Sequence, residues 1–391
     1  MNLAGLFSGI GGLELPFTRR GIHASFLCDV WEPSRQVLSA RFPDVPIHHD
    51  ICELAELPSG TDVLTAGFPC TDLSQAGRMA GIGGSQSSLV GHVFRLIKHH
   101  RLDWLVLENV RNMLVLDGGS AMSYLVEHLE ALGFRWAYRL VDTRFTGLPQ
   151  RRHRVFLVAS RTLDPCEVLF ADDASQEDRT NLRDDAYGFY WTEGLGGLGW
   201  AHDSVPPLKA GSTVGIPSPP AVWVRNAPIG QRIIVPSITD AEALQGFPRD
   251  WTAPAQQSAK KGPRWKLVGN AVSVSVAQWL VDRMRNPGQV VVPGRPWTRS
   301  GRWPDAASGH GGSVWLHHAS THPRIDPYVH LTEVLTMNDA TPLSARATSG
   351  FLSRATRSTL NFDPDFLRDV SEHLKAVGSV GRTLPVENHA A

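Results

Sequence analysis

The chain has 391 residues, of which 42% are hydrophobic and 19% are charged, and its 38 basic residues balance its 38 acidic ones. This composition is ordinary for a globular protein of two or three domains, and a net charge of zero neither favours nor excludes a polyanionic partner. No apolar run approaches the length of a membrane span and the N-terminal residues lack a signal-peptide pattern, so the sequence predicts a cytoplasmic protein without a membrane partner.

The first 160 residues alternate short apolar runs with longer amphipathic segments, which is typical of an α/β fold with a mostly parallel sheet. We expect strands at residues 2–7, 23–28, 63–66, 104–107, 137–142 and 154–160. We expect helices at residues 32–41, 89–100 and 120–132. In such a sheet the carboxyl ends of the parallel strands meet at one edge, where ligands bind.

The rest of the chain falls into three parts. Residues 161–262 are polar and rich in glycine and proline, and they predict a separate, irregular domain. Residues 263–285 regain a helical pattern, and we expect them to return to the first domain. Residues 286–391 are predicted as a C-terminal extension, which includes a packed helix with Asp363 as its N-cap and Phe366 on its apolar face.

A glycine-rich stretch, LFSGIGG, follows the first expected strand. Gly9 and Gly11 allow a tight turn whose N–H groups can approach a ligand, although such turns are also plain structural connectors. Asp29 ends the next strand, where a carboxylate can accept hydrogen bonds from ribose hydroxyls. Asp50 follows the expected third strand and can meet an adenine edge or serve as an ordinary turn residue. Because the G-x-x-x-x-G-K-[ST] pattern is absent, an adenosine-containing cofactor is favoured over a nucleoside triphosphate.

The four cysteines, at positions 28, 52, 70 and 166, match neither a zinc site nor a disulfide framework, so we expect reduced thiols and no metal. Cys70 directly follows Pro69, where an apolar strand runs into the polar loop 71–88. This position presents the thiol instead of packing it, and a presented thiolate can act as a nucleophile. The pattern alone leaves open whether Cys70 is catalytic. The composition of the loop would allow it to move as a lid.

Two further polar groups lie at the same predicted sheet edge. Glu108 ends the apolar strand in DWLVLENV, where burial would raise its pKa and favour the proton-donating form; a solvated strand cap is the alternative. Gln150, Arg152 and Arg154 alternate along GLPQRRHRVFLV and so project to one face of the next strand. Single basic residues at a strand edge are usually solvated, but three polar groups leading into an apolar strand are less usual.

Taken in order, these segments resemble the motifs of the cytosine-5 DNA methyltransferase family. The matching segments are FSGIGG, GFPCTDLSQAG, ENV, QRRHR, LQGFP at residues 244–248 and GNAV at residues 269–272. They cover about residues 3–160 and 230–280. Six matches in the usual order of the family are hard to explain by chance.

The resemblance implies a Rossmann-like, S-adenosylmethionine-dependent methyltransferase domain at residues 1–160, completed by residues 263–285. It also implies a target-recognition domain at residues 161–262. The cofactor would be S-adenosylmethionine, and the residues implied around it are Phe7, Gly9, Gly11, Asp29, Asp50, Asn270, Ala271 and Val272.

The resemblance implies a reaction as well. Cys70 would add to carbon 6 of a cytosine flipped out of double-stranded DNA, and Glu108 would protonate or hydrogen-bond N3 of the base. Arg152 and Arg154 would stabilise the ring-oxygen side. The implied substrate is a specific DNA sequence, and the implied partner is a cognate restriction endonuclease that cuts the same site.

Two positions depart from the family pattern, and three other hypotheses stay open. Thr71 stands where glutamine is usual after the cysteine, and Gln86 stands where an arginine is common. Neither change removes a group that the chemistry requires. The alternatives are methylation of structured RNA, a catalytically silent DNA-binding protein, and methylation of an amino group. The sizeable region between the motifs disfavours the first, the intact catalytic set disfavours the second, and a missing Asp/Asn-Pro-Pro-aromatic signature disfavours the third.

Overall fold

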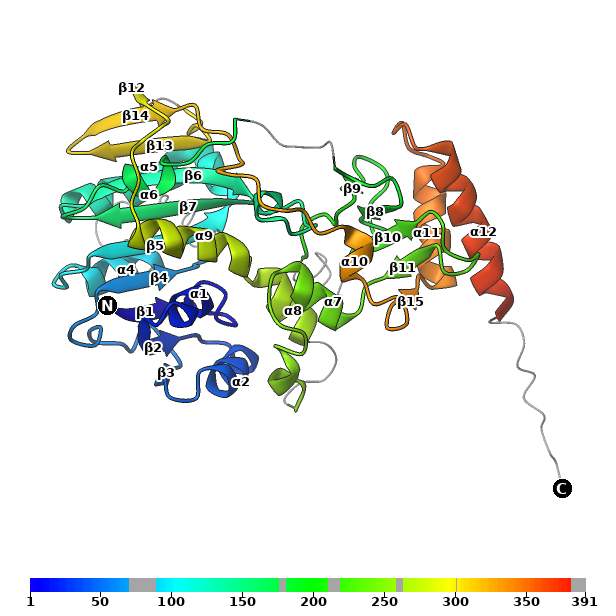
Figure 1. The fold of residues 1–391 in the computed structure, drawn as a ribbon, viewed down its shortest axis with the longest axis horizontal. Coiled ribbons are helices and arrows are strands. Elements are labelled where there is room, and N and C mark those ends of the chain that lie inside the picture. The colour runs from blue at the N-terminus through cyan, green and yellow to red at the C-terminus, as the bar shows by residue number, and fades with distance from the viewer. Residues whose placement is uncertain (70–88, 176–180, 210–218, 258–262, 300, 381–391) are drawn as a thin grey trace.

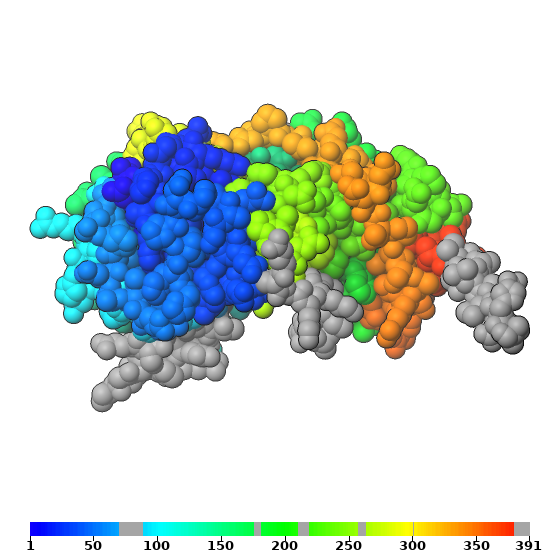
Figure 2. Space-filling view, turned by 90° about the horizontal axis from the view of Figure 1, so that it is seen from below, coloured from blue at the N-terminus to red at the C-terminus, as the bar shows by residue number. Residues whose placement is uncertain are grey.

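The computed structural model describes residues 1–69, 89–175, 181–209, 219–257, 263–299 and 301–380. A ten-stranded sheet and a five-stranded sheet form the framework, and Figure 1 shows them side by side with α7 and α8 between them. In the space-filling view, the yellow-green residues of this middle region fill the space between the blue N-terminal residues and the orange C-terminal ones (Figure 2). Of the helices within these ranges, none has the length and apolar character needed to cross a membrane.

The large sheet has the strand order β12-β14-β13-β6-β7-β5-β4-β1-β2-β3. Strands β3, β2, β1, β4 and β5 pair in parallel, whereas β7 is antiparallel to both β5 and β6. Strand β6 therefore runs in the direction of the parallel strands, and the predicted Rossmann-like, mostly parallel α/β class is confirmed. The bounds are Asn2–Leu6 (β1), His23–Cys28 (β2), Ile47–His48 (β3), Val63–Ala66 (β4), Trp104–Val110 (β5), Arg135–Asp142 (β6), His153–Ser160 (β7), Gly294–Pro296 (β12), Ala306–His310 (β13) and Ser313–His317 (β14).

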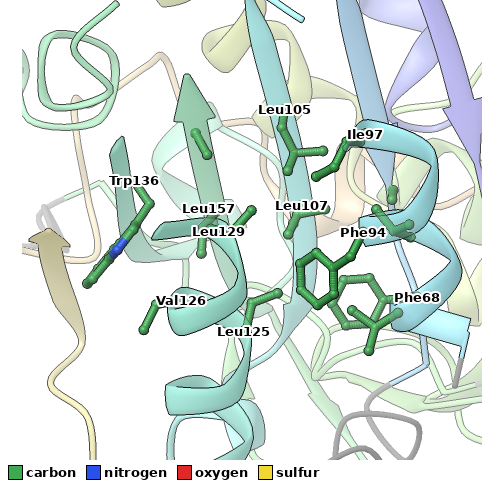
Figure 3. Packing of buried hydrophobic residues seen from close by; sticks show 14 of the residues in the cluster. Phe68, Phe94, Ile97, Leu105, Leu107, Leu125, Val126, Leu129, Trp136 and Leu157 are labelled. Carbon is green, nitrogen blue, oxygen red and sulfur yellow. The ribbon is translucent and has the colours of Figure 1, made fainter. Parts of the chain in front are cut away.

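Both faces of the large sheet are covered by helices, which explains why its central strands are continuous apolar runs. On β5, Leu105 and Leu107 pack with Phe94 of α4 and with α5 on one face (Figure 3). Val106 points to the other face, where Phe17 of α1 belongs to the same core as residues of α9. The helix bounds are Glu14–Arg19 (α1), Glu32–Arg41 (α2), Leu89–Ile97 (α4), Ser120–Ala131 (α5), Cys166–Leu169 (α6) and Val274–Arg285 (α9).

The smaller sheet is antiparallel, with the order β15-β11-β10-β8-β9. Its central strand β10 alternates between two cores: Trp223 packs with Phe366 of α12, whereas Val222 packs with Leu244 of α7 and Leu331 of α10. Helices therefore cover this sheet on both faces too. The bounds are Ala186–Phe189 (β8), Ala201–His202 (β9), Ala221–Val224 (β10), Ile233–Val235 (β11), Thr341–Pro342 (β15), Ile238–Leu244 (α7), Pro263–Asn270 (α8), Leu331–Val334 (α10), Ala345–Ala355 (α11) and Pro364–Val380 (α12).

Most of the elements predicted in the first 160 residues are present with small shifts at their ends. Strands β2 and β4 and helix α2 have the predicted bounds. Strand β5 continues to Val110, so Glu108 and Asn109 lie within the strand and not beyond it. Helix α4 ends at Ile97, three residues before the predicted end.

The predicted division of the chain into 1–160, 161–262 and 286–391 stays a prediction, but the structure shows where each segment packs. Val168 and Leu169 of α6 belong to the core of the large sheet. After residue 286, strands β12–β14 extend the large sheet, whereas β15, α11 and α12 complete the smaller one. The segment expected as a C-terminal extension is thus shared between both sheets.

Replacing Phe366 tests whether α12 is part of the core. The side chain of Phe366 is fully buried against Phe189, Trp200 and Trp223. We expect Phe366→Ala to lower the free energy of unfolding of the smaller sheet and its helices by about 3–5 kcal/mol, because the substitution removes buried apolar surface and leaves a cavity. Denaturant unfolding followed by tryptophan fluorescence measures this change, with the exposed Lys375→Ala on the same helix as the control. Equal midpoints for the two variants would show that α12 is not part of the core.

Candidate active site

The carboxyl ends of the parallel strands open onto a cavity of about 540 Å³. It is lined by the residues that follow β1, β2 and β4, by the end of β5, by the start of β7 and by the end of α8. Because β7 runs antiparallel to β5, its first residues lie at the same edge as the last residues of β5, and Arg154 pairs in register with Val110. Segments more than 100 residues apart in the sequence therefore meet in one cavity.

The glycine loop after β1 is tightly constrained. Gly11 has a φ of 83°, and a Cβ there would lie 2.5 Å from the ring of Phe42. A Cβ on Gly12 would lie 2.7 Å from the backbone oxygen of Val272. Only glycine fits these two positions. The loop thereby brings the start of the chain against the residues that follow α8.

Asp29 anchors this loop. Its carboxylate accepts hydrogen bonds from the backbone N–H groups of Gly9 (2.8 Å) and Trp31 (2.9 Å). Burial raises the pKa of Asp29, and the two backbone hydrogen bonds oppose that rise. Asp29 also lines the cavity, so a partly buried carboxylate is available there to a ligand with hydroxyl groups.

The predicted cofactor residues are not all brought together. Phe7, Gly9, Asp29, Asn270 and Ala271 line the large cavity, and Val272 lines a smaller one beside it. Gly11 supports the loop by donating its N–H to the Ser8 carbonyl (2.7 Å). The carboxylate of Asp50 instead accepts the N–H of Cys52 (2.8 Å), which lowers the pKa of Asp50, and Asp50 is not among the lining residues of either cavity.

Glu108 and Arg154 form an ion pair inside the cavity. The Arg154 Nε lies 3.0 Å from Glu108 Oε1, and both side chains are largely buried. Burial raises the pKa of Glu108, while the positive charges of Arg154 and Arg152 act against it. Burial likewise lowers the pKa of Arg154, and Glu108 opposes that change. A carboxyl group with a raised pKa beside a fixed cation can hold and share a proton.

Arg152 has a different set of partners from Arg154. Its guanidinium donates to the backbone oxygens of Ala271 (2.8 Å), Gly269 (3.2 Å) and Leu208 (3.1 Å). Its Nε has no hydrogen-bond partner among the described residues, although Arg152 is almost fully buried. Arg152 therefore connects the start of β7 to Leu208 and to the backbone at the end of α8. It also lines the cavity.

Two glutamines extend this connection. Gln150 donates to the Leu244 oxygen and to Gln245 Oε1, both at 2.9 Å. Gln245 in turn donates to the backbone oxygens of Val268 (2.9 Å) and Ala271 (3.0 Å). Both glutamines are fully buried. The alternating polar residues of QRRHR therefore have two roles: Gln150 belongs to a buried hydrogen-bond network, and Arg152 and Arg154 line the cavity.

Cys70, Thr71 and Gln86 lie outside the described residues, but the segment that leads to Cys70 is described. Gly67, Phe68 and Pro69 line the cavity. The side-chain Nδ2 of Asn109 donates to the Phe68 oxygen (3.1 Å), and Asn109 is almost fully buried. The strand that carries Glu108 therefore also fixes the chain just before Cys70.

The sequence-based reasoning missed three lining residues. Trp31 and Lys266 line the cavity, and the Lys266 Nζ lies 4.6 Å from the centre of a Trp31 ring. Glu14 is fully buried, accepts a hydrogen bond from Thr65 Oγ1 (2.8 Å) and lines the smaller cavity. Burial raises the pKa of Glu14 to about 7. An acidic residue within the apolar run of GGLELPF was the available signal for Glu14.

Within the described ranges, no three histidine, cysteine, aspartate or glutamate side chains lie close enough to hold a metal ion. The cavity offers the backbone of the glycine loop, the partly buried carboxylate of Asp29 and the Glu108–Arg154 pair. Its chemistry therefore fits an organic cofactor and a base with hydrogen-bonding edges.

Comparisons with known proteins identify the family of the chain. Residues 1–186 match the family model "C-5 cytosine-specific DNA methylase". The chain is similar to the Type II methyltransferase M2.BsuMI of Bacillus subtilis, with 46% identity over 95% of this chain and 97% of the relative. It is also similar to the Type II methyltransferase M.NgoBI of Neisseria gonorrhoeae, with 26% identity over 76% of this chain and 96% of the relative.

Solved structures agree in fold. The crystal structure of the S. pombe Dnmt2 methyltransferase superposes with a TM-score of 0.52, at 15% identity over 72% of this chain and 96% of that chain. The Spodoptera frugiperda DNMT2 mutant gives a TM-score of 0.51, at 13% identity over 73% of this chain and 99% of that chain.

The chain belongs to the C-5 cytosine-specific DNA methylase family. It is a DNA cytosine-5 methyltransferase, and its methyl donor is S-adenosylmethionine.

The raised pKa of Glu14 predicts a pH-dependent stability. The pKa is about 7 in the folded chain against an ordinary value of 4.5, so the folded state holds its proton to higher pH than the unfolded state. The free energy of unfolding should therefore fall by about 3 kcal/mol as the pH rises from below 4.5 to above 7. Glu14→Gln, which cannot ionise, should lack this component. Denaturant unfolding of both proteins at pH 5 and pH 8 measures it, and parallel pH dependences would contradict the assignment.

Proposed function

We propose that the chain methylates carbon 5 of cytosine within one specific double-stranded DNA sequence, through covalent addition of Cys70 to carbon 6 of a flipped-out base. The observation that carries this proposal is the Glu108–Arg154 pair, which lies in the same cavity as the glycine loop, Asp29 and Pro69. A proton-holding carboxyl group, a cofactor loop and the residue before the nucleophile thus share one site.

The cavity fits the cofactor in size and in chemistry. A volume of about 540 Å³ lies within the usual range for small-molecule sites. Asp29 would accept hydrogen bonds from the ribose hydroxyls, and Phe7, Gly9, Asn270 and Ala271 would contact the rest of the molecule. When bound, S-adenosylmethionine supplies an electrophilic methyl group. Gly11 would act by shaping the loop, and Asp50 would act only through its own turn.

The protein groups would activate the cytosine as follows. The Cys70 thiolate adds to carbon 6, and the electron pair of the C5–C6 double bond makes carbon 5 nucleophilic. Glu108, in its protonated form, hydrogen-bonds or protonates N3, which accepts the charge that develops in the ring. Arg154 keeps Glu108 in place and stabilises negative charge on the ring-oxygen side. Once carbon 5 carries the methyl group, a base removes the carbon 5 proton, the electron pair of that C–H bond restores the C5–C6 double bond, and the thiolate leaves carbon 6.

Arg152 would serve this reaction by positioning. It holds the Gly269 and Ala271 backbone against the cavity while Arg154, two residues further along β7, contacts Glu108. Alternation along a strand places both guanidinium groups on one face. A single strand would thereby set the cofactor wall and the catalytic carboxyl group together.

The smaller sheet is the candidate for reading the DNA sequence. Several aromatic and basic residues of this part are engaged within the fold: Trp223 is fully buried, Arg232 pairs with Asp369 (2.7 Å), and Lys209 pairs with Glu193 (2.6 Å). Arg354 donates to the Trp191 and Glu193 oxygens. Base contacts would come from other residues of this part. The methylation step itself requires the target cytosine to leave the duplex stack.

We further propose that this methylation protects host DNA from a cognate restriction endonuclease that cuts the same site. The support is the printed description of the similar proteins as Type II methyltransferases. A DNA substrate also fits the cytoplasmic location expected from the sequence, which stays a prediction.

Methylation of mixed-sequence genomic DNA tests the proposal. We expect labelled methyl groups from S-adenosylmethionine to enter DNA, and bisulfite sequencing to locate them at cytosine in one short motif. Cys70→Ala should abolish methyl transfer while the protein still binds cofactor and DNA, because the thiolate is needed to activate carbon 5.

Three results would contradict the proposal. Equal methylation by Cys70→Ala would exclude the covalent mechanism. Methylation of transfer RNA but not of duplex DNA would change the substrate. Methylation of cytosines without a common sequence motif would contradict the claim that the enzyme recognises one specific DNA sequence.

A further inference from the structure

The chain beyond residue 286 adds an arginine-rich border to the large sheet. Between residues 286 and 325 there are four arginines and one acidic residue, Asp305. This segment contains β12–β14, which Figure 1 shows at one end of the sheet, next to β6. An excess of positive charge favours a polyanionic partner where the arginines are exposed.

Arg302 is an exposed residue of this segment, and its neighbours are fixed. Trp303 is buried, and its indole N–H donates to the Gly119 oxygen (3.0 Å). The backbone N–H of Trp303 donates to the Leu114 oxygen (3.1 Å). Gly119 has a φ of 94° and lies against the Gly301 oxygen, so a larger residue does not fit there. The structure therefore holds Arg302 against the turns that follow β5.

Arg302 and Arg111 share one carboxylate. Arg111 begins the two short helical turns that follow β5, η1 (Arg111–Leu114) and η2 (Leu116–Gly119). Its Nη2 lies 3.1 Å from Asp305 Oδ2, and the Nη2 of Arg302 lies 4.0 Å from Asp305 Oδ1. The exposed fractions of the Arg111 and Arg302 side chains are 49% and 62%. One carboxylate cannot neutralise two guanidinium groups, so a positive charge stays on this surface.

A further arginine lies near Arg111, at the start of β7. His153 Nε2 lies 3.1 Å from Asp142 Oδ2. Burial lowers the pKa of His153, Asp142 opposes this change, and the positive charges of Arg144, Arg111 and Arg151 lower the pKa further. Charges act on a group in this way only from nearby. Arg144 is held by Asp142 (2.7 Å), which leaves Arg111 and Arg151 as the arginines to consider beside His153.

We call the set Arg111, Arg151, Arg302 and Asp305 the arginine edge. It lies beside the large cavity, because Val110 lines that cavity and Arg111 follows it directly. Arg154 also lines the cavity, and alternation along β7 places His153 on the opposite face of the sheet. Leu157 shares that face and packs in one core with residues of α5. The arginine edge is therefore outside the cavity, on the side of the sheet that α5 covers.

We infer that Arg111, Arg151 and Arg302 bind phosphates of the DNA that flanks the target base. A duplex carries one negative charge per roughly 1.7 Å of its axis, so a cytosine that reaches the cavity brings phosphates past exposed cations beside it. A guanidinium group matches a phosphate because it can donate two parallel hydrogen bonds. The inference rests on the proposed function, because it takes duplex DNA as the substrate. It extends the DNA surface to a segment beyond residue 286.

Asp305 has the opposite role in this inference. In the DNA-free protein it holds Arg111 and Arg302 by ion pairing. When DNA is bound, the same carboxylate competes with the phosphates for both guanidinium groups and repels the phosphates. Asp305 therefore limits the affinity of the arginine edge for DNA.

Binding of a fluorescent target duplex in the presence of S-adenosylhomocysteine, the cofactor product, tests the inference without methyl transfer. We expect Arg302→Ala and Arg111→Ala each to weaken binding about 3- to 10-fold, because each removes a charged hydrogen bond at an exposed site. Each should also reduce the slope of log affinity against log salt by about 0.9, the value for one phosphate contact. The loss should be equal for target and unrelated duplexes, because phosphates carry no sequence information.

Asp305→Asn should have the opposite effect and strengthen binding about 2- to 10-fold, because it removes the competing charge. A variant that had merely lost its fold would not bind more tightly than the wild type. The matched controls are Arg20→Ala and Asp282→Asn, which alter an exposed ion pair (2.8 Å) between α1 and α9 on the other face of the sheet. Both controls should bind DNA as the wild type does.

The outcomes separate this inference from the proposed function. If the wild type binds no duplex DNA, the proposed substrate is wrong and the inference fails with it. If the wild type binds DNA but Arg302→Ala and Asp305→Asn match its affinity and salt dependence, the inference is overturned and the proposed function stands. If both substitutions weaken binding, the pair acts through the fold of this border and not through phosphates, which also overturns the inference.

Discussion

The site depends on one buried contact, the ion pair between Glu108 at the end of β5 and Arg154 at the start of β7. A buried carboxylate without a partner would be strongly disfavoured, and a buried guanidinium likewise. The two can stay charged or share a proton because β7 runs antiparallel to β5 and so brings its first residues to the ligand edge. The single reversed strand of this part of the sheet is therefore what places a cation at the functional edge of a parallel fold.

The same edge is closed by residues from much later in the chain. Gly12 contacts the backbone of Val272, Arg152 donates to the Ala271 oxygen, and Gln245 donates to that oxygen as well. These contacts join the first strand, the seventh strand and the residues after α8 around one cavity. The cavity wall thus exists only when the chain returns from the smaller sheet, which couples formation of the cofactor site to folding of the whole protein.

Local patterns predicted the parts of the fold that depend on local chemistry. The apolar runs of β2 and β4 and the amphipathic period of α2 gave the bounds that the structure has. The position of Asp29 after β2 followed from strand order, and its hydrogen bond to Gly9 is consistent with that placement. In contrast, Asp50 satisfies its own turn, an alternative that the sequence left open.

What the sequence could not supply depends on contacts between distant residues. Nothing in QRRHR distinguishes Arg152, which binds backbone oxygens near residues 208 and 270, from Arg154, which meets Glu108. The strands of the smaller sheet are two to four residues long, too short for a clear alternation. Strands β12–β14, which follow residue 290, pair with the large sheet. The sequence pattern of these strands does not predict which sheet they join.

The central claim, that this edge brings a cysteine nucleophile to a cytosine ring, is tested most directly by trapping the adduct. Fluorine at carbon 5 cannot leave as a proton does, so a duplex that carries 5-fluorocytosine at the target position should hold the enzyme after methyl transfer. The account predicts a covalent protein–DNA species in the presence of S-adenosylmethionine. Mass spectrometry of the digested species should find the DNA attached to the peptide that contains Cys70. Efficient methylation of ordinary target DNA together with no adduct on the fluorinated duplex, or an adduct at another residue, would contradict it.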